Sequence, residues 1–264
     1  MTTSQFSLEG RIALVTGGGR GIGAGIATSL AKAGADVIVA DYDIKLAEEG
    51  AAAVKALGRR TAAIVVDVRK PESVTALFDK VEKDFGRLDI AANNAGIVSL
   101  GSIDQLTVAQ WDEVMAVNLR GVFLCTQAEV RLMRKNKFGR IINTASIAGK
   151  VGFPNLSHYS ATKFAVIGFT NAVAKEVATE GITVNALCPG IVGTGMWRGD
   201  TGLSKAWAQP GESEEASWAR HQVAFLPQGE AQTPEDMGQM VVYMASAPHL
   251  TGQALAVDGG FSLG

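Results

Sequence analysis

The chain has 264 residues, of which 47% are hydrophobic and 19% charged, which is enough apolar material for a sizeable core in one large domain or two small ones. Its formal net charge is −2 without any basic block, which argues against nucleic acid as a partner. No apolar run predicts a membrane span, and Met1–Gly10 lacks the features of a signal peptide. Cys125 and Cys188 lie in apolar runs, so we expect buried free thiols in a cytoplasmic protein.

Short β-branched runs alternate with helical patterns in the first half of the chain. Four strands are predicted there: Ile12–Thr16, Val37–Asp41, Ala63–Val68 and Leu88–Asn93. The helices between them carry apolar stripes at Ile22–Leu30, Leu46–Val54 and Val74–Phe85, the last starting just after Pro71.

The alternation continues in the second half of the chain, where three further strands are predicted at Arg140–Ala145, Ile182–Leu187 and Ala254–Asp258. Helices are predicted after a capping box at Thr107–Gln110, over residues 157–178, and from Thr233 through Met244. Strands buried on both faces and joined by crossover helices indicate a mostly parallel, seven-stranded sheet. Without any linker, residues 1–264 are expected to form a single doubly wound, Rossmann-like α/β domain.

The segment Val192–Gln232 lacks clear periodicity and contains Trp197, Trp207 and Trp218. Long irregular segments in compact domains are usually functional or disordered, and three tryptophans argue against pure disorder. We therefore expect a substrate lid with short helices after the sixth strand.

A glycine-rich turn, Thr16–Gly23, follows the first strand. Glycines let the backbone approach a pyrophosphate, whose charge the helix N-terminus favours. Asp41 ends the second strand, where a carboxylate accepts hydrogen bonds from the adenosine ribose hydroxyls. Its charge would repel a 2′-phosphate, so NAD is predicted rather than NADP; Arg20 is the one contrary feature, because a base in this loop could reach a phosphate.

Tyr159 and Lys163 stand four residues apart on the helix predicted over 157–178, and therefore share one face. An ammonium on the same helical face, beside a cationic nicotinamide ring, favours the phenolate and is expected to lower the tyrosine pKa. Such a pair can serve as a general acid and base for an alcohol or a ketone. His158, His221 and His249 are scattered, so no metal site is expected.

Several motifs in order make the chain resemble the short-chain dehydrogenase/reductase family over essentially its whole length. They are the TGxxxGxG spacing of Thr16–Gly23, Asp67-Val68, Asn93–Gly96, Asn118 in its Val-Asn-Leu context, Ser146 thirteen residues before Tyr159, and Pro189-Gly190. Within the family, the segment Cys188–Trp197 resembles that of acetoin reductases and 2,3-butanediol dehydrogenases, to which polyol dehydrogenases are similar.

The resemblance implies a catalytic role for Tyr159 as acid/base, assisted by Lys163, Ser146 and Asn118. It also implies a homotetramer and a nicotinamide cofactor. With the residues discussed above, the expected cofactor-binding set is Gly17, Gly19, Arg20, Gly21, Ile22, Gly23, Asp41, Tyr42, Asp67, Val68, Asn94, Ala95, Gly96, Tyr159, Lys163, Pro189, Gly190, Ile191 and Thr194.

The expected substrate is a small-molecule secondary alcohol or ketone, with a diol, polyol or acetoin-like compound weakly favoured. Ile147 and Phe153 replace the polar residues of the butanediol enzymes, so together with Trp197 they suggest a pocket that accepts an apolar substituent. The alternatives are a 3-oxoacyl thioester reductase and a non-catalytic dinucleotide sensor. The sensor is disfavoured because Asn118, Ser146, Tyr159 and Lys163 are all present.

Overall fold

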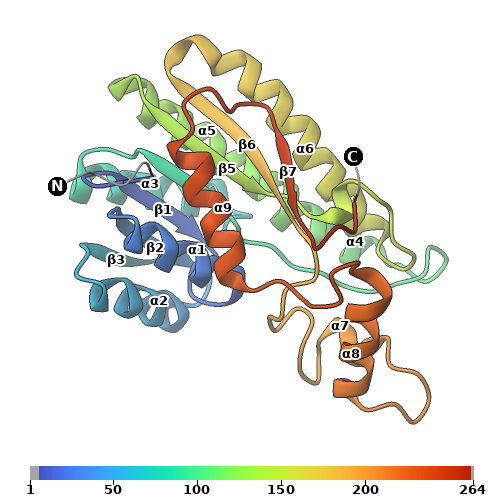
Figure 1. Cartoon of the computed structure of the whole chain (residues 1–264). Coiled ribbons are helices and arrows are strands. Elements are labelled where there is room, and N and C mark those ends of the chain that lie inside the picture. The colour runs from blue at the N-terminus through green and yellow to red at the C-terminus, as the bar shows by residue number, and fades with distance from the viewer. Residues whose placement is uncertain (1–5, 263–264) are drawn as a thin grey trace.

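The computed structural model describes residues 6–262. Part of Met1–Gly10, the segment in which no signal peptide is expected, therefore lies outside the described residues. Seven strands occur in the described part: β1 (Ile12–Thr16), β2 (Asp36–Asp41), β3 (Thr61–Val65), β4 (Ile90–Asn93), β5 (Gly139–Thr144), β6 (Ile182–Pro189) and β7 (Ala254–Val257). They form one sheet in the order β3-β2-β1-β4-β5-β6-β7, and every neighbouring pair is parallel (Figure 1). The prediction of a doubly wound, seven-stranded sheet is confirmed.

The helices of the described residues are α1 (Gly21–Lys32), α2 (Ile44–Ala56), α3 (Pro71–Phe85), α4 (Val108–Met115), α5 (Gly121–Asn136), α6 (Ser157–Val177), α7 (Leu203–Ala206), α8 (Glu214–Phe225) and α9 (Pro234–Ser246). One core cluster packs α1, α2 and α9 on one face of the sheet, and another packs α3, α5 and α6 on the other. None of these helices is long and apolar enough to cross a membrane.

Strand β1 shows how the sequence produces these layers. Ala13 and Val15 belong to the first core cluster, whereas Ile12 and Leu14 belong to the second. Because successive side chains of a strand point to opposite faces, an uninterrupted apolar run is the pattern of a strand covered on both sides. The chain order changes direction between β1 and β4, so a crevice opens there at the carboxyl ends of the strands.

Several predicted strand boundaries are wrong by one to three residues, and those of β3 and β4 show the reason. The strand expected at Ala63–Val68 runs over Thr61–Val65, because its partner β2 pairs with it only from Val37 to Asp41. The strand expected from Leu88 begins at Ile90, where pairing with β1 and β5 starts. In both cases the apolar run continues past the hydrogen-bonded ladder, so composition alone misplaces the end.

The 192–232 segment is closed at its base, since Val192 and Gln232 form a parallel bridge next to the end of β6. It contains α7 and α8, which project from the body of the molecule at one end of the sheet (Figure 1). Helix α8 begins at a capped turn, where the Ser213 hydroxyl accepts a hydrogen bond from the Ala216 N–H. The prediction of short helices in this segment is confirmed.

Candidate active site

A cleft of about 1440 Å³ opens at the carboxyl ends of the strands and reaches under the 192–232 segment. It brings together nearly all the predicted site residues, from Asp41 at one end to Trp197 at the other. Three predicted residues do not line it: Gly19, Gly23 and Asn118. Each of these three instead supports a neighbour that does.

The turn between β1 and α1 requires glycine at several positions, because a Cβ would not fit there or the φ angle is positive. Gly17 and Gly21 have φ angles of 62° and 53°, which favour glycine. A Cβ on Gly23 would stand 1.9 Å from the Gly17 carbonyl oxygen, so this position allows the helix to close onto the turn. The Asn94 side chain then donates to the same Gly17 oxygen at 3.1 Å, and joins the turn to the loop that carries Ala95.

Helix α1 begins at this turn without a side-chain cap. Its N-cap residue Arg20 makes no capping hydrogen bond, and the first turn contains no acidic residue. The N–H groups at the start of a helix need acceptors, and the helix dipole favours an anion there. A glycine cradle beside an uncapped helix N-terminus fits the pyrophosphate of a dinucleotide.

Asp41 lies beside this cradle with only 8% of its surface exposed. Its carboxylate accepts hydrogen bonds from the N–H groups of Gly19 at 3.1 Å and Asp43 at 3.3 Å. Gly19 is therefore a support for Asp41 rather than a lining residue. The carboxylate stays at the cleft wall, where it can accept further hydrogen bonds from ribose hydroxyls.

Arg69 also lines the cleft, and its guanidinium carbon lies 5.5 Å from the centre of the Tyr42 ring. Its guanidinium donates to both oxygens of Asp67 at 2.8 Å and to Glu113 at 2.6 Å. Two carboxylates thus compensate one guanidinium, and little of its charge is left for a phosphate. Sequence reasoning missed this cluster, because Glu113 comes from the distant helix α4.

Tyr159 and Lys163 lie on the buried face of α6, with the Lys163 Nζ 5.5 Å from the centre of the phenol ring. The Lys163 ammonium donates to the Thr144 carbonyl oxygen at 2.8 Å. Burial raises the pKa of Tyr159 to about 12, against a smaller lowering by its hydrogen bond with Ser146. Burial also lowers the pKa of Lys163 to about 8. Within the chain itself, desolvation is therefore the larger effect on the phenol, and the lowering of its pKa by Lys163 together with a cationic nicotinamide ring stays a prediction.

Ser146 follows β5 and faces Tyr159. Its hydroxyl accepts a hydrogen bond from the Ala148 N–H at 3.1 Å, at the start of the short 3₁₀ helix Ile147–Gly149. This bond fixes the serine side chain and directs its remaining hydrogen-bonding capacity to the cleft. The serine and the tyrosine can thus hold one substrate oxygen between them.

Asn118 is buried within a π-helical turn, Ala116–Arg120. Its side chain accepts from the Ile97 N–H and donates to the Ile97 carbonyl, both at 2.9 Å. The amide therefore fastens the loop after Gly96 to the helix region next to Lys163, and it does not reach the cleft.

Ile147, Phe153 and Trp197, predicted as substrate residues, all line the cleft. Sequence reasoning missed Trp207 and Phe225, which line it as well. Phe153 and Trp207 pack in the same apolar cluster as Tyr159. No group of metal-ligating side chains occurs among residues 6–262, and His158 is instead buried against the Ser99 hydroxyl at 2.7 Å.

Comparison with known proteins agrees with this geometry. The profile of the family described as short chain dehydrogenase matches residues 11–202. An L-2,3-butanediol dehydrogenase of Corynebacterium glutamicum is 39% identical, and the match covers 95% of this chain and 98% of that protein. A 3-oxoacyl-(acyl-carrier-protein) reductase of Haemophilus influenzae is 37% identical over 97% of this chain and 100% of its own length. The crystal structure of a short-chain type dehydrogenase/reductase from Mycobacterium marinum is 31% identical, with a TM-score of 0.86 over 98% of both chains.

Proposed function

Because the chain belongs to the short-chain dehydrogenase family, an oxidoreductase family whose members bind a nicotinamide dinucleotide, we propose that it is an NAD-dependent dehydrogenase of secondary alcohols. The reaction moves a hydride between the carbinol carbon and the nicotinamide, and is reversible. The observation that carries the proposal is one cleft that holds Asp41 at the nucleotide end and Tyr159 beside Ser146 at the other.

When bound, the nicotinamide accepts or supplies the hydride. The residues of the chain manage the proton and the position of the substrate oxygen. We assign Tyr159 as the group that gives its proton to a ketone oxygen, or takes one from an alcohol. Ser146 donates a hydrogen bond to the same oxygen as charge develops on it, and the Lys163 ammonium lies 5.5 Å from the centre of the phenol ring. Asn118 supports the region next to Lys163, because its amide fixes the loop at Ile97.

The nucleotide end of the cleft supports NAD rather than NADP. A 2′-phosphate would come close to the Asp41 carboxylate, and Arg69 is already bound by Asp67 and Glu113. Arg20 is exposed at the turn and also lines the cleft. Its exposure leaves it well solvated, so it offsets little of the repulsion by Asp41.

A reductase of 3-oxoacyl thioesters is the second candidate, since a relative of similar identity carries that name. The butanediol dehydrogenase relative favours the first candidate.

We also propose that the chain is one domain and acts as a cytoplasmic homotetramer. Buried free thiols at Cys125 and Cys188 support a reducing compartment, and exposed Phe123 and Phe164 on α5 and α6 support association.

The cofactor assignment predicts that the wild type uses NADH with at least about tenfold higher kcat/KM than NADPH, since one lost charge-assisted contact alone changes binding by about 1.5–3 kcal/mol. Replacement of Asp41→Ser together with Tyr42→Arg should move the preference towards NADPH. Steady-state kinetics with both cofactors, and their dissociation constants from fluorescence titration, measure this directly. Equal use of both cofactors by the wild type would contradict the assignment and make Arg20 the phosphate ligand.

A further inference from the structure

Four aromatic side chains line the cleft beside Tyr159: Phe153, Trp197, Trp207 and Phe225. Phe153 and Phe225 meet at 6.2 Å between ring centres with a 74° interplanar angle, and Trp197 and Trp207 meet at 5.6 Å with 75°. Such edge-to-face pairs are favourable arrangements of aromatic rings. Together these four residues, the aromatic wall, form an apolar surface near the acid/base.

The aromatic wall is supported from behind by His221, which is 4% exposed. Its ring stacks on Phe225 at 5.6 Å with a 10° interplanar angle and lies 5.7 Å from the Trp207 ring. The His221 Nδ1 lies 2.7 Å from the Ser217 carbonyl oxygen, to which it donates. Burial lowers the pKa of His221, so it contributes a neutral ring to this packing.

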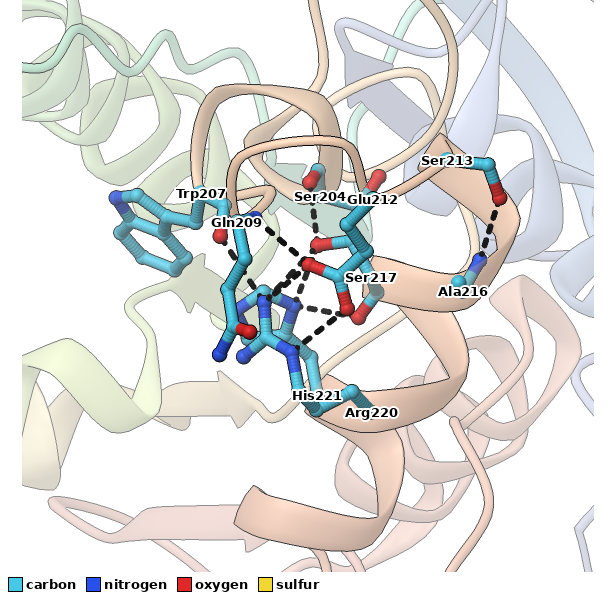
Figure 2. Close-up of polar contacts among 9 residues, drawn as sticks. All are labelled: Ser204, Trp207, Gln209, Glu212, Ser213, Ala216, Ser217, Arg220 and His221. Atoms are coloured by element: carbon cyan, nitrogen blue, oxygen red, sulfur yellow. Dashed lines mark hydrogen bonds and ion pairs between the residues drawn. The ribbon is translucent and has the colours of Figure 1, made fainter.

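Polar contacts fix Trp207 from the backbone side (Figure 2). The Arg220 guanidinium donates to the Trp207 carbonyl oxygen at 3.0 Å and binds both oxygens of Glu212 at 2.8–2.9 Å. The Ser217 hydroxyl donates to the Ser204 carbonyl at 2.7 Å, three residues before Trp207. Helix α8 therefore holds the α7 turn, and Trp207 with it, in one position before any ligand binds. A preformed wall costs less ordering entropy on binding than a flexible one.

Besides Lys163, Arg198 is a charged residue that lines this part of the cleft, and its charge is compensated. The guanidinium binds both oxygens of Glu214 at 2.8 and 3.0 Å and lies 5.2 Å from the centre of the Trp218 ring. A hydroxyl or carboxylate on the substrate would thus find few unengaged partners beyond Ser146 and Tyr159. A site built in this way discriminates by shape and apolar contact.

We propose that the substrate carries an aryl or another flat, apolar group beside its reacting carbon, and that this group lies against Trp207 and Phe225. The inference rests on the proposed function and narrows its substrate class. It differs from the small-diol assignment that the resemblance to butanediol dehydrogenases favours. The flat group of the substrate packs against the rings of Trp207 and Phe225, which the fold already holds in position. Tyr159 and Ser146 hold the oxygen of the substrate.

The test compares acetophenone with acetoin as ketone substrates and NADH as the reductant. The wild type should show at least about tenfold higher kcat/KM with acetophenone, within the range that apolar pocket contacts give. Trp207→Ala should lower the acetophenone-to-acetoin ratio by about 10–200-fold, mainly through KM. Trp218→Ala is the control, because the Trp218 indole packs against Trp197 at 6.0 Å between ring centres but does not line the cleft itself.

Trp207→Leu gives a second variant that keeps apolar volume and should still lower the ratio if the alanine variant does not fold. A wild type that prefers acetoin, or equal changes of the ratio in the Trp207 and Trp218 variants, would overturn the inference and leave the proposed function intact. Absence of NADH-linked turnover with every secondary alcohol and ketone offered would overturn both.

Discussion

The Tyr159→Phe variant is expected to lose about 10²–10⁴-fold in kcat, the scale of general acid–base catalysis. Phenylalanine keeps the ring and its packing against Leu156 and Phe153, and removes only the hydroxyl that shares a hydrogen bond with Ser146. NADH affinity should stay within a few-fold of wild type, because the loss concerns the proton and not the nucleotide contacts. Stopped-flow absorbance with saturating ketone and a fluorescence titration with NADH separate the two effects.

Tyr243→Phe is the matched control for this variant, since Tyr243 is 46% exposed on α9 and does not line the cleft. The same substitution there should leave kcat unchanged. A Tyr159→Phe enzyme with near-normal turnover on its best substrate would show that another group moves the proton.

The pH dependence of the reaction follows from the same residue. With a pKa of about 12 in the protein alone, Tyr159 is protonated throughout the neutral range and is ready to act as an acid towards a ketone. Alcohol oxidation needs the phenolate, whose fraction rises with pH. Oxidation rates should therefore increase from pH 6 to pH 9 more steeply than reduction rates do.

A second large effect is expected at Glu129, a fully buried carboxyl on α5 that the proposed mechanism does not use. One of its oxygens accepts from the Asn93 side chain at 3.0 Å, and the other has no hydrogen-bond partner. Burial raises the pKa of Glu129 from 4.5 to about 8, and the Asn93 bond opposes this only partly. The neighbouring Cys125 thiol has its own pKa raised by burial.

Between these two pKa values the unfolded chain ionises Glu129 whereas the folded chain keeps it protonated. The unfolded state then binds fewer protons, so the contribution of Glu129 to stability falls as pH rises, by about 1.4 kcal/mol per pH unit. Glu129→Gln has the same shape and no titration. Its gain in unfolding free energy over wild type should therefore grow from near zero at pH 5 to a few kcal/mol at pH 8.

Urea unfolding of both proteins at pH 5 and pH 8 measures this gain. Glu48→Gln serves as the control, because Glu48 is exposed on α2 and should change stability equally little at both pH values. A gain for Glu129→Gln that is independent of pH would mean that the folded protein ionises this carboxyl in the neutral range.

The sequence predicts the sheet and most of the cleft because both follow from local patterns. The strand at Ile12–Thr16 and the turn at Gly17–Gly23 are determined by the residues of these segments themselves. Helix α6 likewise begins at the predicted residue. The position of Asp41 beside the turn could therefore be predicted from spacing alone.

What was missed depends on contacts between distant segments. Glu113 reaches Arg69 across 44 positions, and Trp207 and Phe225 reach Phe153 only after α8 folds back onto the cleft. The raised pKa of Tyr159 was also missed, because it depends on how completely the fold excludes water from the phenol. The distance from Lys163 along the helix does not reveal this. Ser213 before two glutamates was a helix-start signal that could have located α8.

Direct hydride transfer to the nicotinamide is the central claim, and an isotope label tests it most directly. A secondary alcohol that the enzyme oxidises is prepared with deuterium at its carbinol carbon and incubated with NAD. Mass spectrometry of the reduced cofactor should then show one deuterium at the nicotinamide ring for each ketone formed, together with slower turnover by the labelled alcohol. Ketone formation with the deuterium released to water, or without any reduced cofactor, would contradict the account.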